Sequence, residues 1–245
     1  MTPNTEFRAG AVAPVECLKA GWATIKDRYW LFLGITLVAM LIGGAVPILI
    51  IGSMMGGLYL CLFAKMRGEQ VQFERLFKGF DYFVPGLVAA AIQTLPVLIL
   101  VVAADVFFFV FMFATVPRDT YSRNQAPPPL FFLGVIVFVL FVLIVSLTIH
   151  TLFLFAYPLI VDRKLSGWDA IKTSYRAAVN NIGGILGLVL LNFLLGIAGL
   201  LCCYVGVIFV MPVSFASYAA AYRQVFPDVP ETFTSPPPPP GNWAA

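Results

Sequence analysis

The only histidine of the chain, His150, lies inside a long apolar run together with a serine and a tyrosine. Ser146, His150 and Tyr157 are spaced four and seven residues apart, so they share one face of a helix. Such groups inside an apolar segment can relay protons or bind a solute. A neutral imidazole can equally act as a hydrogen-bonding group between helices. With Asp105 and Asn192, these residues form a candidate polar path for a small solute or ion.

Both additional residues also have a structural interpretation. Asp105 lies about 35 Å along its helix, near the outer membrane boundary, where a carboxylate reaches water. Asn192 lies on a helix side rich in small residues, which allow helices to approach closely while asparagine bonds across them. That side comprises Asn181, Gly184, Asn192, Gly196 and Gly199. Gly52 and Gly56 form a similar spacing earlier in the chain.

Most catalytic motifs are absent from the sequence. It has no GxxxxGK[ST], no HExxH and no GxSxG, and its four cysteines form no CxxC pair. We therefore expect no cofactor, no metal site and no enzyme activity. A lipid-modifying enzyme is a further class, and it would need polar side chains to converge near Asp81, Asp162 and Asn180.

Composition points to a membrane protein. Of the 245 residues, 60% are hydrophobic and only 11% are charged, whereas soluble domains carry about 25% charged residues. A spanning helix needs about 20 apolar residues. The sequence predicts an all-α bundle with six spanning helices in three pairs. The predicted helices cover 29–45 and 48–66, then 82–116 and 130–161, then 182–223 with a break near residues 202–206.

Flanking segments complete the predicted organisation. Residues 1–13 are an N-terminal tail, 14–225 form one membrane domain, and 226–245 form a disordered tail. Five consecutive prolines, Pro236–Pro240, make this tail extended, as a spacer or as a ligand for an aromatic groove.

Basic residues set the orientation. Only Arg118 and Arg123 of the 15 Lys and Arg residues fall on one side of the predicted helices. The positive-inside rule therefore places both termini in the cytoplasm of a bacterium, with the chain in its inner membrane.

A short apolar pattern with i, i+3, i+7 spacing precedes each predicted pair. It reads Val15/Leu18/Trp22, Phe73/Leu76/Phe80 and Trp168/Ile171/Tyr175. The spacing predicts three amphipathic helices on the cytoplasmic surface. Basic and aromatic side chains there are candidates for contact with the inner leaflet. These residues are Lys19, Trp22, Lys78, Phe80, Lys172, Tyr175 and Arg176.

The segment PLIVDRKLSGWDAIKTSYRAAVNN, from Pro158 onward, carries a family resemblance, together with the LFKGF segment and the glycine-rich 52–57 region. It resembles bacterial six-helix integral membrane proteins, including the membrane domain attached to some glycerophosphodiester phosphodiesterases. The resemblance implies an envelope or lipid-related setting and carries no catalytic residues over to this chain.

The sequence thus favours a non-catalytic membrane protein in envelope or lipid homeostasis, or a scaffold. The expected partners are membrane lipids and other membrane proteins or further copies of the chain, with no nucleic acid. The alternative is a small-solute or ion transporter with its path near His150. A continuous polar cavity reaching His150 would favour transport, and a dry, packed bundle would favour the scaffold.

Overall fold

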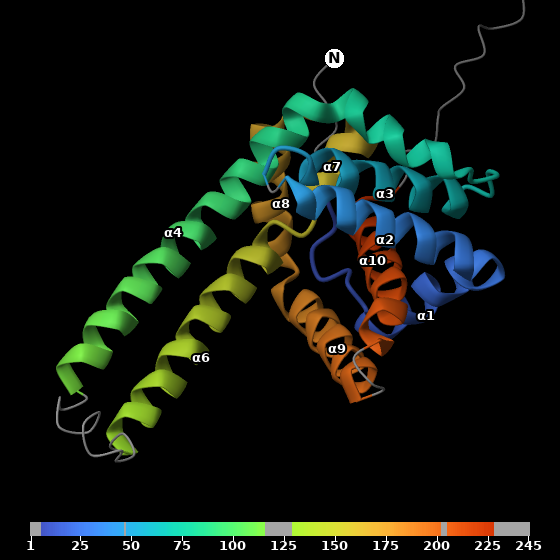
Figure 1. Cartoon of the computed structure of the whole chain (residues 1–245). Coiled ribbons are helices and arrows are strands. Elements are labelled where there is room, and N and C mark those ends of the chain that lie inside the picture. The colour runs from blue at the N-terminus through green and yellow to red at the C-terminus, as the bar shows by residue number, and fades with distance from the viewer. Residues whose placement is uncertain (1–5, 47, 116–128, 202–204, 228–245) are drawn as a thin grey trace, which may run out of the picture.

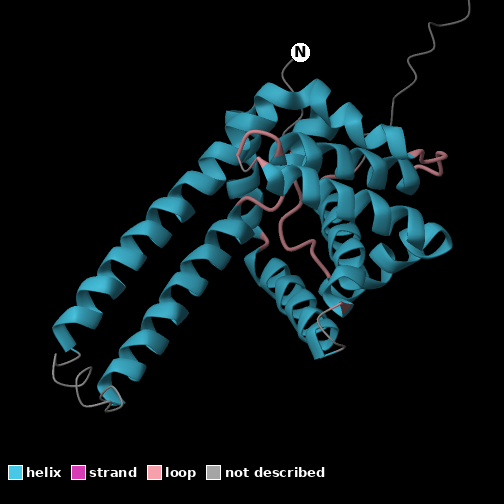
Figure 2. Cartoon of the chain, in the orientation of Figure 1, coloured by secondary structure: helices cyan, strands magenta, loops and turns pink. Residues whose placement is uncertain are grey.

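The computed structural model describes residues 6–46, 48–115, 129–201 and 205–227. Every regular element in these ranges is a helix, as the sequence predicts (Figures 1 and 2). The elements in chain order are α1 (Pro14–Ile25), η1 (Lys26–Arg28), α2 (Tyr29–Ala45), α3 (Ile51–Met66), η2 (Phe73–Tyr82), α4 (Phe83–Thr115), α6 (Pro129–Leu152), α7 (Ala156–Arg163), α8 (Gly167–Asn180), α9 (Ile182–Leu201) and α10 (Gly206–Val225).

Four helical stretches of the described chain are long and apolar enough to cross a membrane. They are Pro14–Ala45, Phe73–Phe111, Phe131–Arg163 and Ile182–Leu201. The helix predicted at 48–66 begins only at Ile51 and has 16 residues, so it is shorter than these four. The proline-rich tail, the polar loop with Arg118 and Arg123, and the Cys202–Cys203 pair lie outside the described residues.

A long hairpin of α4 and α6 projects from the rest of the molecule (Figure 1). The first part of α4 runs across the bundle, and the helix then bends and runs beside α6. Pro96 lies inside α4. It lacks an amide hydrogen and its ring crowds the preceding turn, which accounts for such a bend. Large apolar side chains along the projecting part are exposed, including Val106, Phe109, Leu140 and Ile144.

The helix predicted at 130–161 is interrupted. Residues 153–155 form a turn between α6 and α7. The Ser174 hydroxyl on α8 donates to the Leu152 carbonyl at 3.0 Å and accepts from the Phe155 amide at 3.2 Å. These bonds satisfy backbone groups that a continuous helix would have paired, so a residue about 20 positions away stabilises the break.

Helix α1 packs lengthwise against α10 in an antiparallel direction. The Cys17 thiol donates to Gln224, Gly21 lies against Ala216 and Ser217, and the Tyr29 hydroxyl donates to the Phe209 carbonyl. The buried side of α1 consists of Cys17, Gly21 and Ile25. Val15 and Trp22 of the predicted apolar face are exposed. Small residues form the inner side because they let the two backbones approach.

The second amphipathic segment is a 3-10 helix, η2, rather than an α-helix. Its backbone lies directly on the glycine-rich face of α3. A Cβ atom built on Gly57 would lie 1.9 Å from the Leu76 carbonyl oxygen, and one on Gly79 would lie 2.0 Å from that of Ser53. Gly52 makes an equally close approach to Gly86 at the start of α4. The small residues therefore serve backbone packing, as their spacing predicts.

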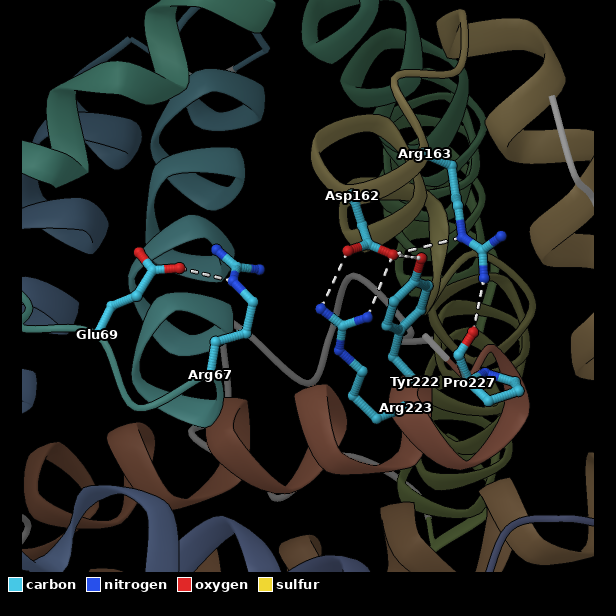
Figure 3. Close-up of polar contacts among 7 residues, drawn as sticks. All are labelled: Arg67, Glu69, Asp162, Arg163, Tyr222, Arg223 and Pro227. Carbon is cyan, nitrogen blue, oxygen red and sulfur yellow. Dashed lines mark hydrogen bonds and ion pairs between the residues drawn. The ribbon is translucent and has the colours of Figure 1, made fainter. Parts of the chain in front are cut away.

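Helices α3 and α10 cross each other steeply, and this is visible from two directions (Figures 1 and 3). Their contact joins Phe63 to Tyr222, whose ring centroids are 5.2 Å apart, and to the Arg223 guanidinium. Two helices that cross steeply cannot both stand upright in a bilayer.

The N-terminal segment 8–13, which we call the N-terminal strap, is packed against the bundle. Its Arg8 amide donates to the Val225 carbonyl, and the Gly10 amide donates to the Asn180 carbonyl. Asn181 accepts from the Ala11 amide at 2.8 Å and donates to the Arg8 carbonyl at 3.0 Å. Part of the predicted tail is thus held by backbone and amide hydrogen bonds to α8 and α10.

Candidate functional site

Three residues of the predicted polar path meet in one groove. Ser146 and His150 on α6 and Tyr157 on α7 line it together with Gln93 and Thr94 on α4. The groove encloses about 410 Å³. Its apolar wall is formed by Ile51, Met55, Val97, Ile149 and Phe215. The groove lies where the hairpin joins the rest of the molecule, near Pro96 and the break between α6 and α7.

The polar side chains of this groove have no hydrogen-bond partners within the described part of the chain. The Gln93 side-chain carbonyl oxygen is buried and unpaired. No hydrogen bond joins Thr94, Ser146, His150 or Tyr157 through their side chains to another described residue. The imidazole is exposed and makes an edge-to-face contact with the Tyr218 ring, at 6.3 Å between centroids. Five polar groups therefore face a groove that contains no protein partner for them.

Asn192 lies elsewhere, between α9 and α10. Its amide nitrogen donates to the Leu188 carbonyl at 2.9 Å and to the Ser217 hydroxyl at 3.1 Å. The Ser217 hydroxyl donates to the Ser214 carbonyl at 2.7 Å. Asn192 is only 6% exposed, so its polar groups are engaged inside the bundle. This arrangement matches the packing interpretation of the residue.

Asp105 lies on the projecting part of α4, and its side chain is exposed. It does not line the groove that holds His150. Three of the five residues of the predicted path therefore share one groove, and the other two, Asp105 and Asn192, lie at separate positions. Within the described residues they do not form a continuous polar cavity.

A partly buried ion pair joins α7 to α10 (Figure 3). Arg223 donates to the Asp162 carboxylate at 3.0 and 3.4 Å, and the Tyr222 hydroxyl donates to it at 2.7 Å. The Arg223 guanidinium also stacks on the Phe63 ring at 4.5 Å. Arg163 lies 3.5 Å from the same carboxylate and donates to the Pro227 carbonyl at 2.9 Å. Asp162 is thus fully engaged in structural contacts.

A lipid-modifying enzyme would need polar side chains to converge near Asp81, Asp162 and Asn180. Asp81 and Asn180 are both exposed. The Asn180 amide donates to the Arg176 carbonyl within its own helix at 2.8 Å. Both oxygens of Asp162 accept hydrogen bonds within the fold, from Tyr222 and Arg223. In the described residues no group of three or more histidine, cysteine or acidic side chains is placed to hold a metal ion.

A second ionic cluster closes the connection between α3 and η2. Glu69 accepts from Arg67 at 2.7 Å and pairs with Arg75 at 2.7 Å (Figure 3 shows the first contact). Both guanidinium groups lower the pKa of the Glu69 carboxyl. Lys65 at the end of α3 pairs with Asp27 after α1, and this contact lowers the pKa of Asp27. These three ion pairs hold the end of α3 to η1 and to η2.

All seven residues predicted to contact the inner leaflet are exposed. They are Lys19 and Trp22 on α1, Lys78 and Phe80 on η2, and Lys172, Tyr175 and Arg176 on α8. The Lys172 ammonium lies over the Trp168 ring at 5.1 Å. Helix α8 begins at Gly167 with the predicted capping box, because the Ser166 hydroxyl accepts from the Asp169 amide. The three groups lie on separate elements.

Comparison with protein-family models, with curated proteins and with solved structures gave no match for this chain. The resemblance to six-helix membrane domains therefore stays a prediction. The structure adds Gln93 and Thr94, which the sequence analysis missed. Their signal was available, since the pair is polar, lies inside an apolar run and stands just before Pro96.

Proposed function

We propose that this protein is a non-catalytic integral membrane scaffold of the bacterial cytoplasmic membrane, acting in envelope or lipid homeostasis. The observation that carries this proposal is the contrast between surface and interior. The α4–α6 hairpin exposes apolar side chains along its length, whereas the buried Asn192 and Ser217 and the partly buried Asp162 are paired inside the bundle. A bilayer supplies the apolar surroundings that the hairpin needs.

The hairpin has the dimensions of a membrane-crossing pair. The part of α4 after Pro96 has 19 residues and α6 has 24, which correspond to about 28 and 36 Å of helix. Both values are close to the bilayer core of about 30 Å. Together with α9 and the 20-residue α10, these helices give four crossings; α10 is counted here in place of the Pro14–Ala45 stretch.

The first predicted pair, α2 and α3, fits upright crossing least well. Their 17 and 16 residues reach only about 25 Å, and α3 crosses α10 steeply (Figure 1). We propose that α2 and α3 enter the membrane from the cytoplasmic side and return without crossing. If α2 and α3 do not cross, the number of crossings falls by two, and every other loop stays on the same side of the membrane. Both termini therefore stay cytoplasmic, as the distribution of basic residues predicts.

Transport is the rival function, and the divided polar path disfavours it. A carrier needs its polar residues along one route, yet Asp105 and Asn192 are separated from the His150 groove. The exposed basic and aromatic residues on α1, η2 and α8 supply a scaffold with contacts to anionic headgroups.

A flux measurement tests the choice between scaffold and transporter. Purified protein is reconstituted into phosphatidylethanolamine–phosphatidylglycerol vesicles that contain a pH-sensitive dye. We expect the wild type and His150→Ala to give the same proton leak as protein-free vesicles, with an ionophore as the positive control. A leak in the wild type that His150→Ala abolishes would establish transport instead.

A further inference from the structure

The groove that holds His150 has the composition of a lipid-binding site. Five polar side chains from α4, α6 and α7 line it, together with five apolar side chains from α3, α4, α6 and α10. A polar group without a partner is costly in a membrane, because lipid tails cannot replace water as a hydrogen-bonding medium. The groove therefore requires a molecule that is polar at one end and apolar at the other.

The lining residues define the charge of that molecule. No Lys, Arg, Asp or Glu lines the groove. A phosphate would lose its hydration there with no Lys or Arg to pair with it, and an ammonium group would find no carboxylate. The polar end of the occupant is therefore uncharged.

The hydrogen-bonding side chains of the groove indicate which functional groups the bound molecule carries. The buried Gln93 carbonyl oxygen is an acceptor and needs an O–H donor. The hydroxyls of Thr94, Ser146 and Tyr157 can donate, and they need acceptor oxygens. A free hydroxyl beside ester carbonyls satisfies both requirements, and the acyl chains cover the apolar wall.

We propose that this groove binds diacylglycerol, an uncharged lipid with one free hydroxyl. This inference rests on the membrane placement proposed above, since only a protein in the bilayer meets this lipid at the hairpin. The position of the groove supports it, because the groove lies near Pro96 and the turn at 153–155, where the hairpin joins the rest of the molecule.

The test measures binding of a fluorescent diacylglycerol to the protein in lipid nanodiscs. Gln93→Leu keeps the side-chain volume and removes the acceptor, and we expect it to weaken binding about tenfold, the effect of losing one well-placed hydrogen bond. The matched control is Thr148→Val on the same helix as His150, because the Thr148 hydroxyl bonds its own helix at Ile144. This control should bind like the wild type.

Competitor lipids identify the chemistry. Unlabelled diacylglycerol should displace the probe, whereas triacylglycerol, which lacks the hydroxyl, and phosphatidic acid, which is charged, should not. Equal displacement by triacylglycerol, or equal binding by wild type and Gln93→Leu, would overturn the proposal. Displacement by a long-chain polyprenol alone would overturn it in favour of a lipid alcohol without carbonyl groups.

A second measurement separates a binding defect from misfolding. In lipid-free detergent, Gln93→Leu should melt at or above the wild-type temperature, because it removes a buried unpaired acceptor. Added diacylglycerol should stabilise the wild type more than the variant. If the chain fails to insert into nanodiscs at all, the membrane proposal fails, whereas insertion without binding overturns the groove assignment alone.

Discussion

At the scale of single residues, Glu69 is the acidic group with the clearest electrostatic role. It lies between Arg67 and Arg75, and these lower its pKa. A carboxylate with a lowered pKa in the folded protein stabilises the fold above its unfolded pKa. This contribution is lost as the pH falls through the lowered value. The side chain is 41% exposed, so water screens the interaction.

Glu69→Gln should therefore lower the melting temperature at pH 7 by about 1–2 °C. The difference from the wild type should shrink once the pH drops below the ordinary glutamate value of 4.5 and vanish below the lowered folded value. Fluorescence-detected melting in detergent over this pH range measures the effect. Glu74→Gln on η2 is the control, since Glu74 is exposed and forms no ion pair with the described residues. A constant difference at all pH values would contradict the ionic explanation.

Single residues also show what sequence can and cannot predict. The Ser166–Asp169 cap was predictable because its geometry is local. The turn at 153–155 was not, because the segment has no glycine or proline and the break depends on Ser174 of another helix. A hydrogen bond between distant segments leaves no periodic pattern in the sequence.

At the scale of elements, sequence predicted which segments are helical better than how the helices face. Apolar runs with glycine and proline breaks located α2, α4 and α9 closely. The apolar pattern of α1 was predicted to face the membrane surface, and Val15 and Trp22 are exposed; the buried side, Cys17, Gly21 and Ile25, was not predicted. In a membrane protein, hydrophobicity does not distinguish a side facing lipid from a side facing protein, whereas small residues mark close helix contacts.

The α2–α3 pair gives a prediction that belongs to this scale. In a variant without the native cysteines, Leu49→Cys places a thiol at an exposed position between α2 and α3. We expect no labelling by a membrane-impermeant maleimide added outside spheroplasts, because the pair does not cross. Val205→Cys, exposed just before α10, is the positive control and should label from outside. External labelling of both cysteines would show that α2 and α3 cross, as the prediction of six spanning helices requires.

At the scale of the whole molecule, the hairpin decides how the protein is held in the bilayer. Leu140 lies at the middle of α6 and is 52% exposed. A lysine at the centre of a spanning helix costs about 3 kcal/mol on the insertion scale. Leu140→Lys should therefore increase the fraction of chain that alkaline carbonate extracts from membranes.

Leu140→Phe serves as the control for this experiment, because it keeps the position apolar, and it should remain in the membrane fraction. Equal extraction of the lysine and phenylalanine variants, at the level of the wild type, would show that α6 does not cross at that depth.

The N-terminal strap has a consequence for the order of events during synthesis. Its partners include Asn181, Gln224 and Val225, which lie 170 residues or more beyond it in the chain. The strap must therefore wait until α10 has been made before it can dock. Until then the earlier helices carry an open flank where α10 will insert. A nascent chain that stalls before Gln224 cannot close this flank, so the strap docks only after α10 has been synthesised.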